Sequence, residues 1–154
     1  MSSNASSYPK SAFECSFTRT YHADLSMIGI IRNDVLALKE YQLLDDDKRD
    51  ALIIIITEMM TNAIKHGSLG IENALVILGV SNIEDTVICI FEDSGPGFDR
   101  STIPDPTLPA YIHRDHGRGI FITEHLADEV RYEYIHDIMR IIVVIEKTNR
   151  NTIQ

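Results

Sequence analysis

Three polar side chains lie along one edge of a predicted helix. Glu58, Asn62 and Lys65 are four and three residues apart, which places them within an arc of about 60° on a helix that turns about 100° per residue. A carboxylate, an amide and an ammonium group aligned in this way can accept a proton, ligate a hard cation and contact a phosphate. The same spacing is also typical of a solvated helix face with an ordinary i,i+4 polar pair, so this segment alone leaves both interpretations open.

A second segment places an acidic residue where an apolar run ends. Asp93 leaves a predicted strand and enters a turn that contains Gly95 and Gly97. Glycines let the backbone approach a flat ligand closely, and a carboxylate held at a strand end can accept a hydrogen bond from an exocyclic amine. An isolated Asp-Ser-Gly-Pro-Gly run is equally typical of a simple tight turn.

A third segment places glycines directly before a predicted helix. Gly117 and Gly119 flank Arg118 at this point, where free backbone N–H groups and the positive end of the helix dipole could hold a phosphate. A lone Gly-x-Gly is weak support for such a site. The three segments in this order, with a long loop between the second and the third, favour a nucleotide site.

Hydrophobic periodicity predicts the first elements that must position these residues. Phe13, Cys15 and Phe17 alternate with polar residues, which is the period of a half-buried strand. From Leu25 to about Gln42, apolar residues recur at steps of three or four and predict one amphipathic helix. Its opposite, polar face comprises Arg32, Asn33, Lys39 and Glu40.

A second helix carries the first polar segment. The acidic run 45–47 supplies N-cap candidates, the helix extends to about His66, and Gly67 follows as a stop. Its inner arc consists of Leu52, Ile55, Ile56, Met59, Ala63 and Ile64. The remaining predicted elements are a hairpin (74–80 with 86–91), a long loop (93–119), a short helix (120–127) and a closing hairpin (130–135 with 138–147).

The amino-acid composition limits the kinds of protein and of partner that are expected. The 154 residues carry 14 Lys and Arg against 23 Asp and Glu, a formal net charge of −9, and 44% of them are apolar. This is enough for one domain core, and the acidic balance argues against nucleic acid or an anionic membrane as partner. The longest apolar run, 51–56, is far below the roughly 20 residues of a membrane span, so we expect a cytoplasmic protein.

Two further expectations concern the cysteines and the ends of the chain. Cys15 and Cys89 could pair in principle, but we expect buried free thiols. Residues 1–11 are Ser-rich and predict a disordered tail, 12–148 the domain, and 149–154 a polar C-terminal tail.

The three segments resemble the ATP-binding motifs of the GHKL superfamily, which includes histidine kinases, type II topoisomerase ATPase domains and anti-sigma factor serine kinases. Residues 58–67 look like its N box, 93–98 like its G1 box, and 117–120 like its G2 box. The resemblance covers about residues 12–148. It implies a Bergerat-type ATP-binding α/β fold, an α+β two-layer sandwich whose mixed, mostly antiparallel sheet carries three helices on one face.

The resemblance also implies roles for individual residues. Asn62 would ligate Mg²⁺, Glu58 would be the catalytic base, and Asp93 would hold the adenine amine, while Gly95 and Gly97 let the backbone close over the base. Further nucleotide contacts would come from Lys65, His66, Phe98, Arg114, Gly117, Arg118, Gly119 and Ile120.

Two positions depart from the family pattern. The arginine that related kinases direct to the γ-phosphate has only Arg114 and Arg118 as candidates, and neither is in register. A Gly-Thr pair in the final hairpin is replaced by residues 137–139, so one hydroxyl near the adenine would be missing.

The motif Glu-x-x-x-Asn-Ala-x-x-His-Gly is most similar to the corresponding motif of anti-sigma factor serine/threonine kinases. It implies a Mg-ATP-dependent kinase that binds a sigma factor and phosphorylates an anti-sigma factor antagonist of the STAS type. Two alternatives stay open, a nucleotide-gated binding module that sequesters a partner without phosphotransfer, and a plain ATPase that serves as a regulatory subunit. The sheet face opposite the helices leaves room for a homodimer.

Overall fold

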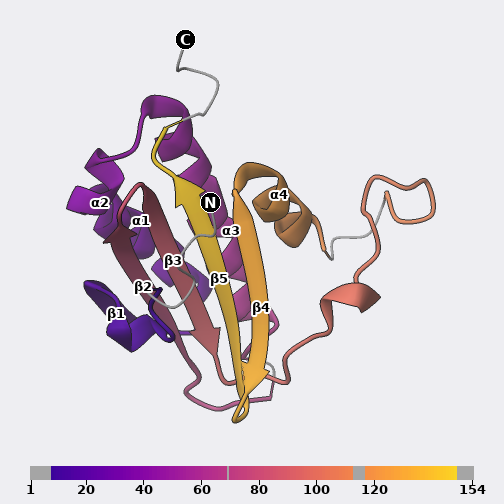
Figure 1. Ribbon diagram of the computed structural model, residues 1–154. Helices are drawn as coiled ribbons and strands as arrows, with labels where there is room; N and C mark the ends of the chain where they lie inside the picture. The colour runs from indigo at the N-terminus through magenta and orange to yellow at the C-terminus, as the bar shows by residue number, and fades with distance from the viewer. Residues whose placement is uncertain (1–7, 69, 113–116, 149–154) are drawn as a thin grey trace.

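The computed structural model describes residues 8–68, 70–112 and 117–148 (Figure 1). The helical elements are η2 (Ala12–Glu14), η3 (Leu25–Met27), α1 (Ile28–Leu36), α2 (Lys39–Gln42), α3 (Asp46–Lys65), η4 (Arg100–Thr102) and α4 (Arg118–Leu126). The strands are β1 (Phe17–His22), β2 (Leu75–Ile83), β3 (Thr86–Asp93), β4 (Glu129–Ile135) and β5 (Ile138–Glu146). The strands form one sheet in the order β1-β2-β3-β5-β4, and each neighbouring pair is antiparallel.

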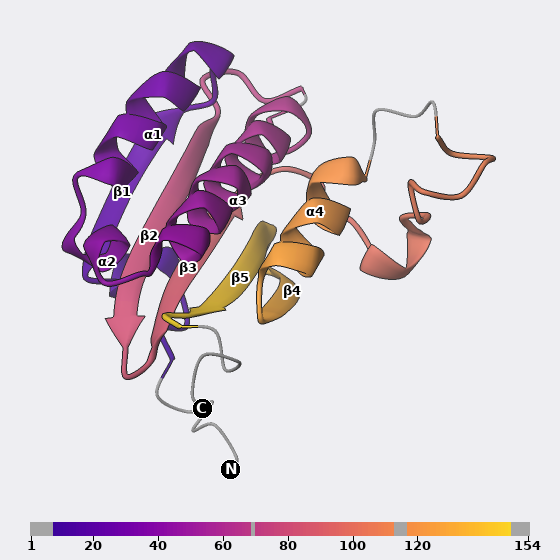
Figure 2. The same ribbon diagram turned by 90° about the horizontal axis from the view of Figure 1, so that it is seen from above.

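Helices α1, α3 and α4 lie side by side on one face of the sheet, which confirms the predicted two-layer architecture (Figures 1 and 2). Alternate residues of β3 divide between the faces. Val87, Cys89 and Phe91 join the core under the helices, while Ile88 and Ile90 belong to a smaller apolar cluster on the outer face. The alternation follows from the two-residue period of a strand.

Helix α3 is the central element of the core. It begins where the Asp45 carboxylate accepts a hydrogen bond from the Lys48 N–H at 3.0 Å, an N-cap contact, and it ends at Lys65 with His66 as C-cap. The inner arc is buried as predicted: Leu52, Ile55, Ile56, Met59, Ala63 and Ile64.

The first strand, predicted from Phe13 to Thr18, begins later than predicted. Residues 12–14 form the short helix η2, and the first strand begins at Phe17. The Ala12 carbonyl accepts hydrogen bonds from the Thr18 hydroxyl and the Cys15 N–H, so the chain turns at this point instead of extending. Tyr8 also packs against the sheet, although composition placed residues 8–11 in a tail. Residues 1–7 and 149–154 lie outside the described residues.

The single helix predicted from Leu25 to Gln42 is broken. Leu38 has extended backbone angles (φ −76°, ψ 141°) and separates α1 from α2. The break turns Glu40, predicted on the solvent face, inward. It is 3% exposed and accepts a hydrogen bond from the Ser16 hydroxyl at 3.0 Å.

Both predicted hairpins are present. The first is longer than expected, since β2 and β3 pair as far as Ile83 and Thr86. The second closes across His136 and Asp137, whose φ angles of 53° and 61° suit a two-residue turn of type I′. Cys15 and Cys89 are free, Cys89 fully buried and Cys15 partly. Among the described residues, no helix is both long and apolar enough to cross a bilayer.

The buried arc of α3 should dominate stability. Ile56 is 0% exposed and Ile54, on the same helix, is 43% exposed. We expect Ile56→Ala to lower the free energy of unfolding by about 2–5 kcal/mol, because it leaves a cavity in the core. Ile54→Ala, the matched control, should change it by less than about 0.5 kcal/mol. Urea denaturation measures both, and equal losses would contradict the burial described here.

Candidate functional site

A cavity of about 380 Å³ lies between α3, the ends of β3 and β5, the start of α4 and the segment 99–112, which we call the lid. This volume is within the range of small-molecule sites. The lining residues are Met59, Asn62, Ala63, His66, Gly67, Phe91, Asp93, Pro96, Gly97, Phe98, Thr102, Ile103, Pro104, Gly117, Ile120, Met139 and Ile141. They are mostly apolar, so a flat aromatic ligand would be bound chiefly by contact.

Asp93 is the acidic group in this apolar wall. Burial raises the pKa of its carboxyl, and the hydrogen bond from the Gly95 N–H lowers it by a smaller amount. That bond goes to Oδ1 at 2.9 Å, and among the described residues it is the one hydrogen bond to this carboxylate. The group therefore keeps acceptor capacity for a ligand N–H.

Two glycines hold the end of α3 against the end of β3. A Cβ atom on Gly67 would lie 2.3 Å from Asp93 Cγ, and one on Gly95 would lie 2.4 Å from the Gly67 carbonyl oxygen. Both distances are too short for any side chain. The carboxylate consequently rests directly on the backbone that follows α3.

Glu58 and Asn62 reach the first turn of α4. A Cβ atom on Gly119 would lie 2.7 Å from Glu58 Oε2 and 3.3 Å from Asn62 Nδ2, so both side chains contact the helix backbone at this point. Gly117, the N-cap residue of α4, has a φ of 84°, which favours glycine. A carboxylate, an amide and the N–H groups of a helix N-terminus thus meet at one edge of the cavity.

The structure brings most of the predicted site residues together. Asn62, His66, Asp93, Gly97, Phe98, Gly117 and Ile120 line the cavity, and Glu58, Gly95 and Gly119 pack directly beside residues of that lining.

Two predicted basic residues, Lys65 and Arg118, do not line the cavity. Lys65 is exposed at the end of α3. The Arg118 guanidinium donates to the Ile112 carbonyl oxygen and lines a separate cavity between the lid and α4. Arg114 lies outside the described residues.

Two residues of the cavity wall, Met59 and Met139, were not predicted as site residues. Met59 was assigned only to the core, although it also lines the cavity. Met139 pairs with Asp93 in the sheet, through the β3–β5 register, for which the sequence holds no local signal. Beside this wall, the Tyr134 ring packs against Gly97, where a Cβ atom would lie 2.7 Å from Tyr134 Cδ2.

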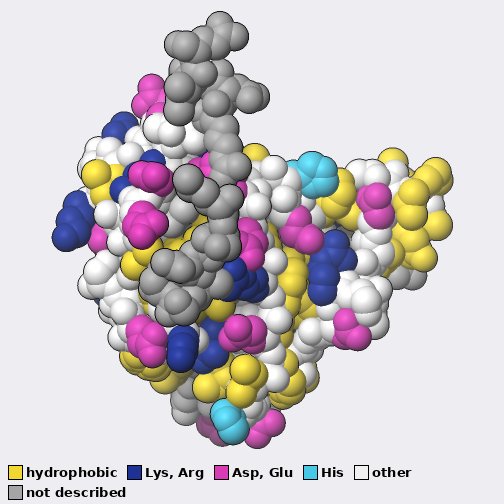
Figure 3. All heavy atoms as spheres, in the orientation of Figure 1, with side chains coloured by type: hydrophobic (Ala, Val, Ile, Leu, Met, Phe, Trp, Pro, Cys, Tyr) yellow, Lys and Arg dark blue, Asp and Glu magenta, His cyan; other side chains and the backbone are white. Residues whose placement is uncertain are grey.

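The lid is the most projecting part of the molecule (Figure 1). Its start is tied to α4 by an ion pair between Arg100 Nε and Glu124 Oε1 at 2.6 Å. Hydrophobic side chains gather on the projecting part (Figure 3), where Leu108 and Ile112 are about half exposed.

The site can be compared with known proteins. A family model for a histidine kinase-like ATPase domain matches residues 21–145. The serine-protein kinase RsbW of Oceanobacillus iheyensis is 28% identical over 94 residues, which cover 57% of this chain and 60% of that protein. The crystal structure of the RsbU and RsbW domains of Rv1364c from Mycobacterium tuberculosis superposes with a TM-score of 0.56, at 13% identity, over 85% of this chain and 32% of that chain. This likeness shows a shared fold.

Because Asp93 is buried, we expect its replacement to change the free energy of unfolding in a pH-dependent way. A carboxyl whose pKa is raised by folding stabilises the fold most at low pH, and this contribution is lost as pH rises through the raised pKa. In the ligand-free chain, we expect Asp93→Asn to raise the free energy of unfolding at pH 7. This gain in the free energy of unfolding should vanish below about pH 4, because the Asp93 carboxyl group is then protonated in both the folded and the unfolded chain. Urea denaturation at the two pH values measures this, and a gain at pH 4 alone would contradict the assigned cause.

Proposed function

The chain belongs to the histidine kinase-like ATPase domain family, and from this premise we propose that it is a Mg-ATP-dependent serine/threonine protein kinase acting as an anti-sigma factor. Its substrate would be an anti-sigma factor antagonist of the STAS type. The observation that carries the proposal is the meeting of Glu58, Asn62 and the Gly119 backbone at the edge of the cavity. The name of the RsbW relative, a serine-protein kinase, supports the choice of reaction.

The adenine would occupy the apolar end of the cavity. The Asp93 carboxylate would accept a hydrogen bond from the exocyclic amine. Phe91, Met139 and Ile141 line this part of the cavity and would contact the ring faces. Apolar walls with one precisely placed polar group give both affinity and orientation.

The phosphates would lie toward the first turn of α4. The N–H groups there would donate to phosphate oxygens, and the Asn62 amide oxygen would hold Mg²⁺. The ion suits this donor set, because Mg²⁺ is held by few protein ligands when substrate phosphates and waters complete its shell. When bound, it would neutralise charge on the phosphates during transfer.

Glu58 would act as the base. Its carboxylate would take the proton of the acceptor Ser or Thr hydroxyl while that oxygen bonds to the γ-phosphorus and the bond to the β-phosphate oxygen breaks. The products would be the phosphorylated antagonist and ADP. The new phosphate brings about −1.5 to −2 charges, which a chain of net charge −9 would repel.

A second candidate function is a nucleotide-gated binding module that sequesters its partner without phosphotransfer. One observation favours it: among the described residues that line the cavity, none is Lys or Arg. With these described residues alone, the transition state of phosphotransfer would lack a side-chain cation.

The experiment that separates the two functions uses Glu58→Gln. Proteins that copurify with the chain are incubated with Mg-ATP, and transferred phosphate is mapped by mass spectrometry. We expect phosphate on a Ser or Thr of a small copurifying protein, and at least a 100-fold lower rate with Glu58→Gln, because general base catalysis contributes about 10²–10⁴-fold. The control Glu72→Gln changes an exposed carboxylate in a turn and should leave the rate unchanged. Partner binding without any transfer would establish the binding module instead.

Asp93→Asn tests the adenine position. The amide would present N–H groups to the exocyclic amine, so we expect Mg-ATP binding to weaken by about 1–3 kcal/mol. Isothermal titration calorimetry measures the affinity, with Asp50→Asn, an exposed position on α3, as the control. Unchanged affinity for Asp93→Asn would contradict the nucleotide position proposed here.

A further inference from the structure

Residues 8–15, which we call the strap, pack against an apolar cluster on the outer face of the sheet. Ala12 is 0% exposed and packs with Ile88, Ile90, Ile142 and Val144 of β3 and β5. Tyr8 and Cys15 pack against the same cluster, and the Arg131 guanidinium of β4 lies 5.5 Å from the Tyr8 ring centroid. The strap therefore crosses from the β1 side of the sheet toward β4.

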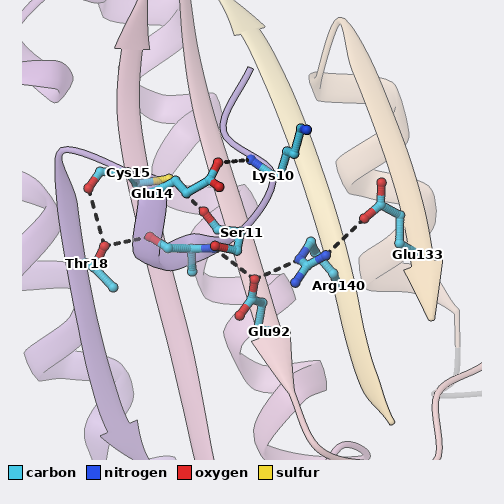
Figure 4. Close-up of polar contacts among 9 residues, drawn as sticks. Lys10, Ser11, Glu14, Cys15, Thr18, Glu92, Glu133 and Arg140 are labelled. Atoms are coloured by element: carbon cyan, nitrogen blue, oxygen red, sulfur yellow. Dashed lines mark hydrogen bonds and ion pairs between the residues drawn. The ribbon is translucent and has the colours of Figure 1, made fainter. Parts of the chain in front are cut away.

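A buried carboxylate holds the strap (Figure 4). Glu92 is 2% exposed, and its Oε1 accepts hydrogen bonds from the Ala12 N–H at 2.9 Å and from Arg140 Nε at 2.7 Å. Arg140 also donates to Glu133 Oε2 at 3.2 Å. Because a buried carboxylate is costly unless it is paired, the strap N–H and the Arg140 guanidinium together satisfy this group.

Gly79 of β2 provides the space beneath the strap. A Cβ atom there would lie 2.7 Å from the Ala12 carbonyl oxygen, 2.8 Å from Ala12 Cα and 2.7 Å from Cys15 Sγ. Two of these are backbone atoms, which cannot rotate away. Any larger residue at Gly79 must displace the strap.

The residues that hold the strap alternate with residues of the cavity wall. Glu92 lies between Phe91 and Asp93, and its partner in the sheet, Arg140, lies between Met139 and Ile141. Phe91, Asp93, Met139 and Ile141 all line the cavity. Since neighbouring residues of a strand point to opposite faces, the strap contacts and the adenine end of the cavity lie back to back on β3 and β5.

We propose that the docked strap is a positioning element of the nucleotide site, fixing the ends of β3 and β5 and with them the orientation of the Asp93 carboxylate. Strap docking and nucleotide binding then favour each other, and the coupling is reciprocal. The inference rests on the proposed function in that it requires this cavity to bind Mg-ATP.

The test uses the full chain with Gly79→Ala, which places a methyl group against the strap backbone. Gly29→Ala is the matched control, because a Cβ atom at Gly29 would meet nothing within 4 Å. We expect Gly79→Ala to weaken Mg-ATP binding about fivefold or more, the lower range of coupling between sites, and Gly29→Ala to leave it unchanged. Titration calorimetry gives both affinities.

Because the coupling is reciprocal, Mg-ATP should also affect the docking of the strap. A strap with a purely structural role would not respond to Mg-ATP. In the unmodified chain, saturating Mg-ATP should slow hydrogen exchange of the Ala12 amide by the same factor, measured by NMR. The Ser26 amide, which donates to Asp24 within a local turn, is the control and should not change. Equal exchange of the Ala12 amide with and without Mg-ATP would overturn the coupling.

Ala12→Pro opens the strap in a second way. It removes the N–H that donates to Glu92, and the preceding Ser11 already has the extended backbone that proline requires (φ −149°, ψ 164°). We expect the same loss of affinity as with Gly79→Ala. Unchanged affinity in both variants would overturn the strap's role and leave nucleotide binding intact, whereas absence of Mg-ATP binding by the unmodified chain would overturn the proposed function itself.

Discussion

The contact between the Gly67 backbone and the Asp93 carboxyl group is the constraint on which the rest of the site depends. It joins the end of the longest helix to the end of a central strand, at a separation that only glycine permits. Because α3 is rigid, fixing its end also fixes Asn62 and Glu58, one and two turns earlier. The distance between the proposed base-binding and phosphate-binding ends of the cavity would thereby be set by the length of a helix.

Two adjacent carboxyl groups at the end of β3 lie on opposite faces of the sheet and have different surroundings. Glu92 faces outward, where Arg140 and the strap N–H satisfy it within the fold. Asp93 faces the cavity, where burial raises its pKa and one backbone N–H is its partner. The first group is stabilised by the protein itself, and the second retains a desolvation cost that a ligand can relieve. This is the exchange of stability for binding expected at functional sites.

The sequence predicts those helices and strands in which the spacing of apolar residues matches the buried face. It does not predict the backbone where contacts with residues distant in the sequence determine the local conformation. Helix α3 and both hairpins were predicted because apolar spacing along them matches the buried face. The start of the first strand at Phe13 was wrong because Ala12 packs over Gly79. The unbroken helix at 25–42 was wrong because Glu40 turns in toward Ser16. The glycine motifs predicted where the cavity lies, since glycine spacing reflects backbone shape. The direction of a long, flexible arginine side chain such as Arg118 has no such local signal.

The charge balance of the site follows from the same arrangement. Under the proposed function, a triphosphate that enters an acidic chain of net charge −9 would have to be neutralised locally. The described cavity wall offers the N–H groups of α4, an amide and a carboxylate, while the Arg118 guanidinium is bound to the lid carbonyl of Ile112. In the proposed site, neutralisation by these described groups would therefore depend on the helix N-terminus and on Mg²⁺ bound with the nucleotide. In the proposed kinase, any further positive charge for transfer would come from a residue outside the described cavity wall or from the phosphate acceptor, and in the second case the chemistry would be tied to the arrival of a partner.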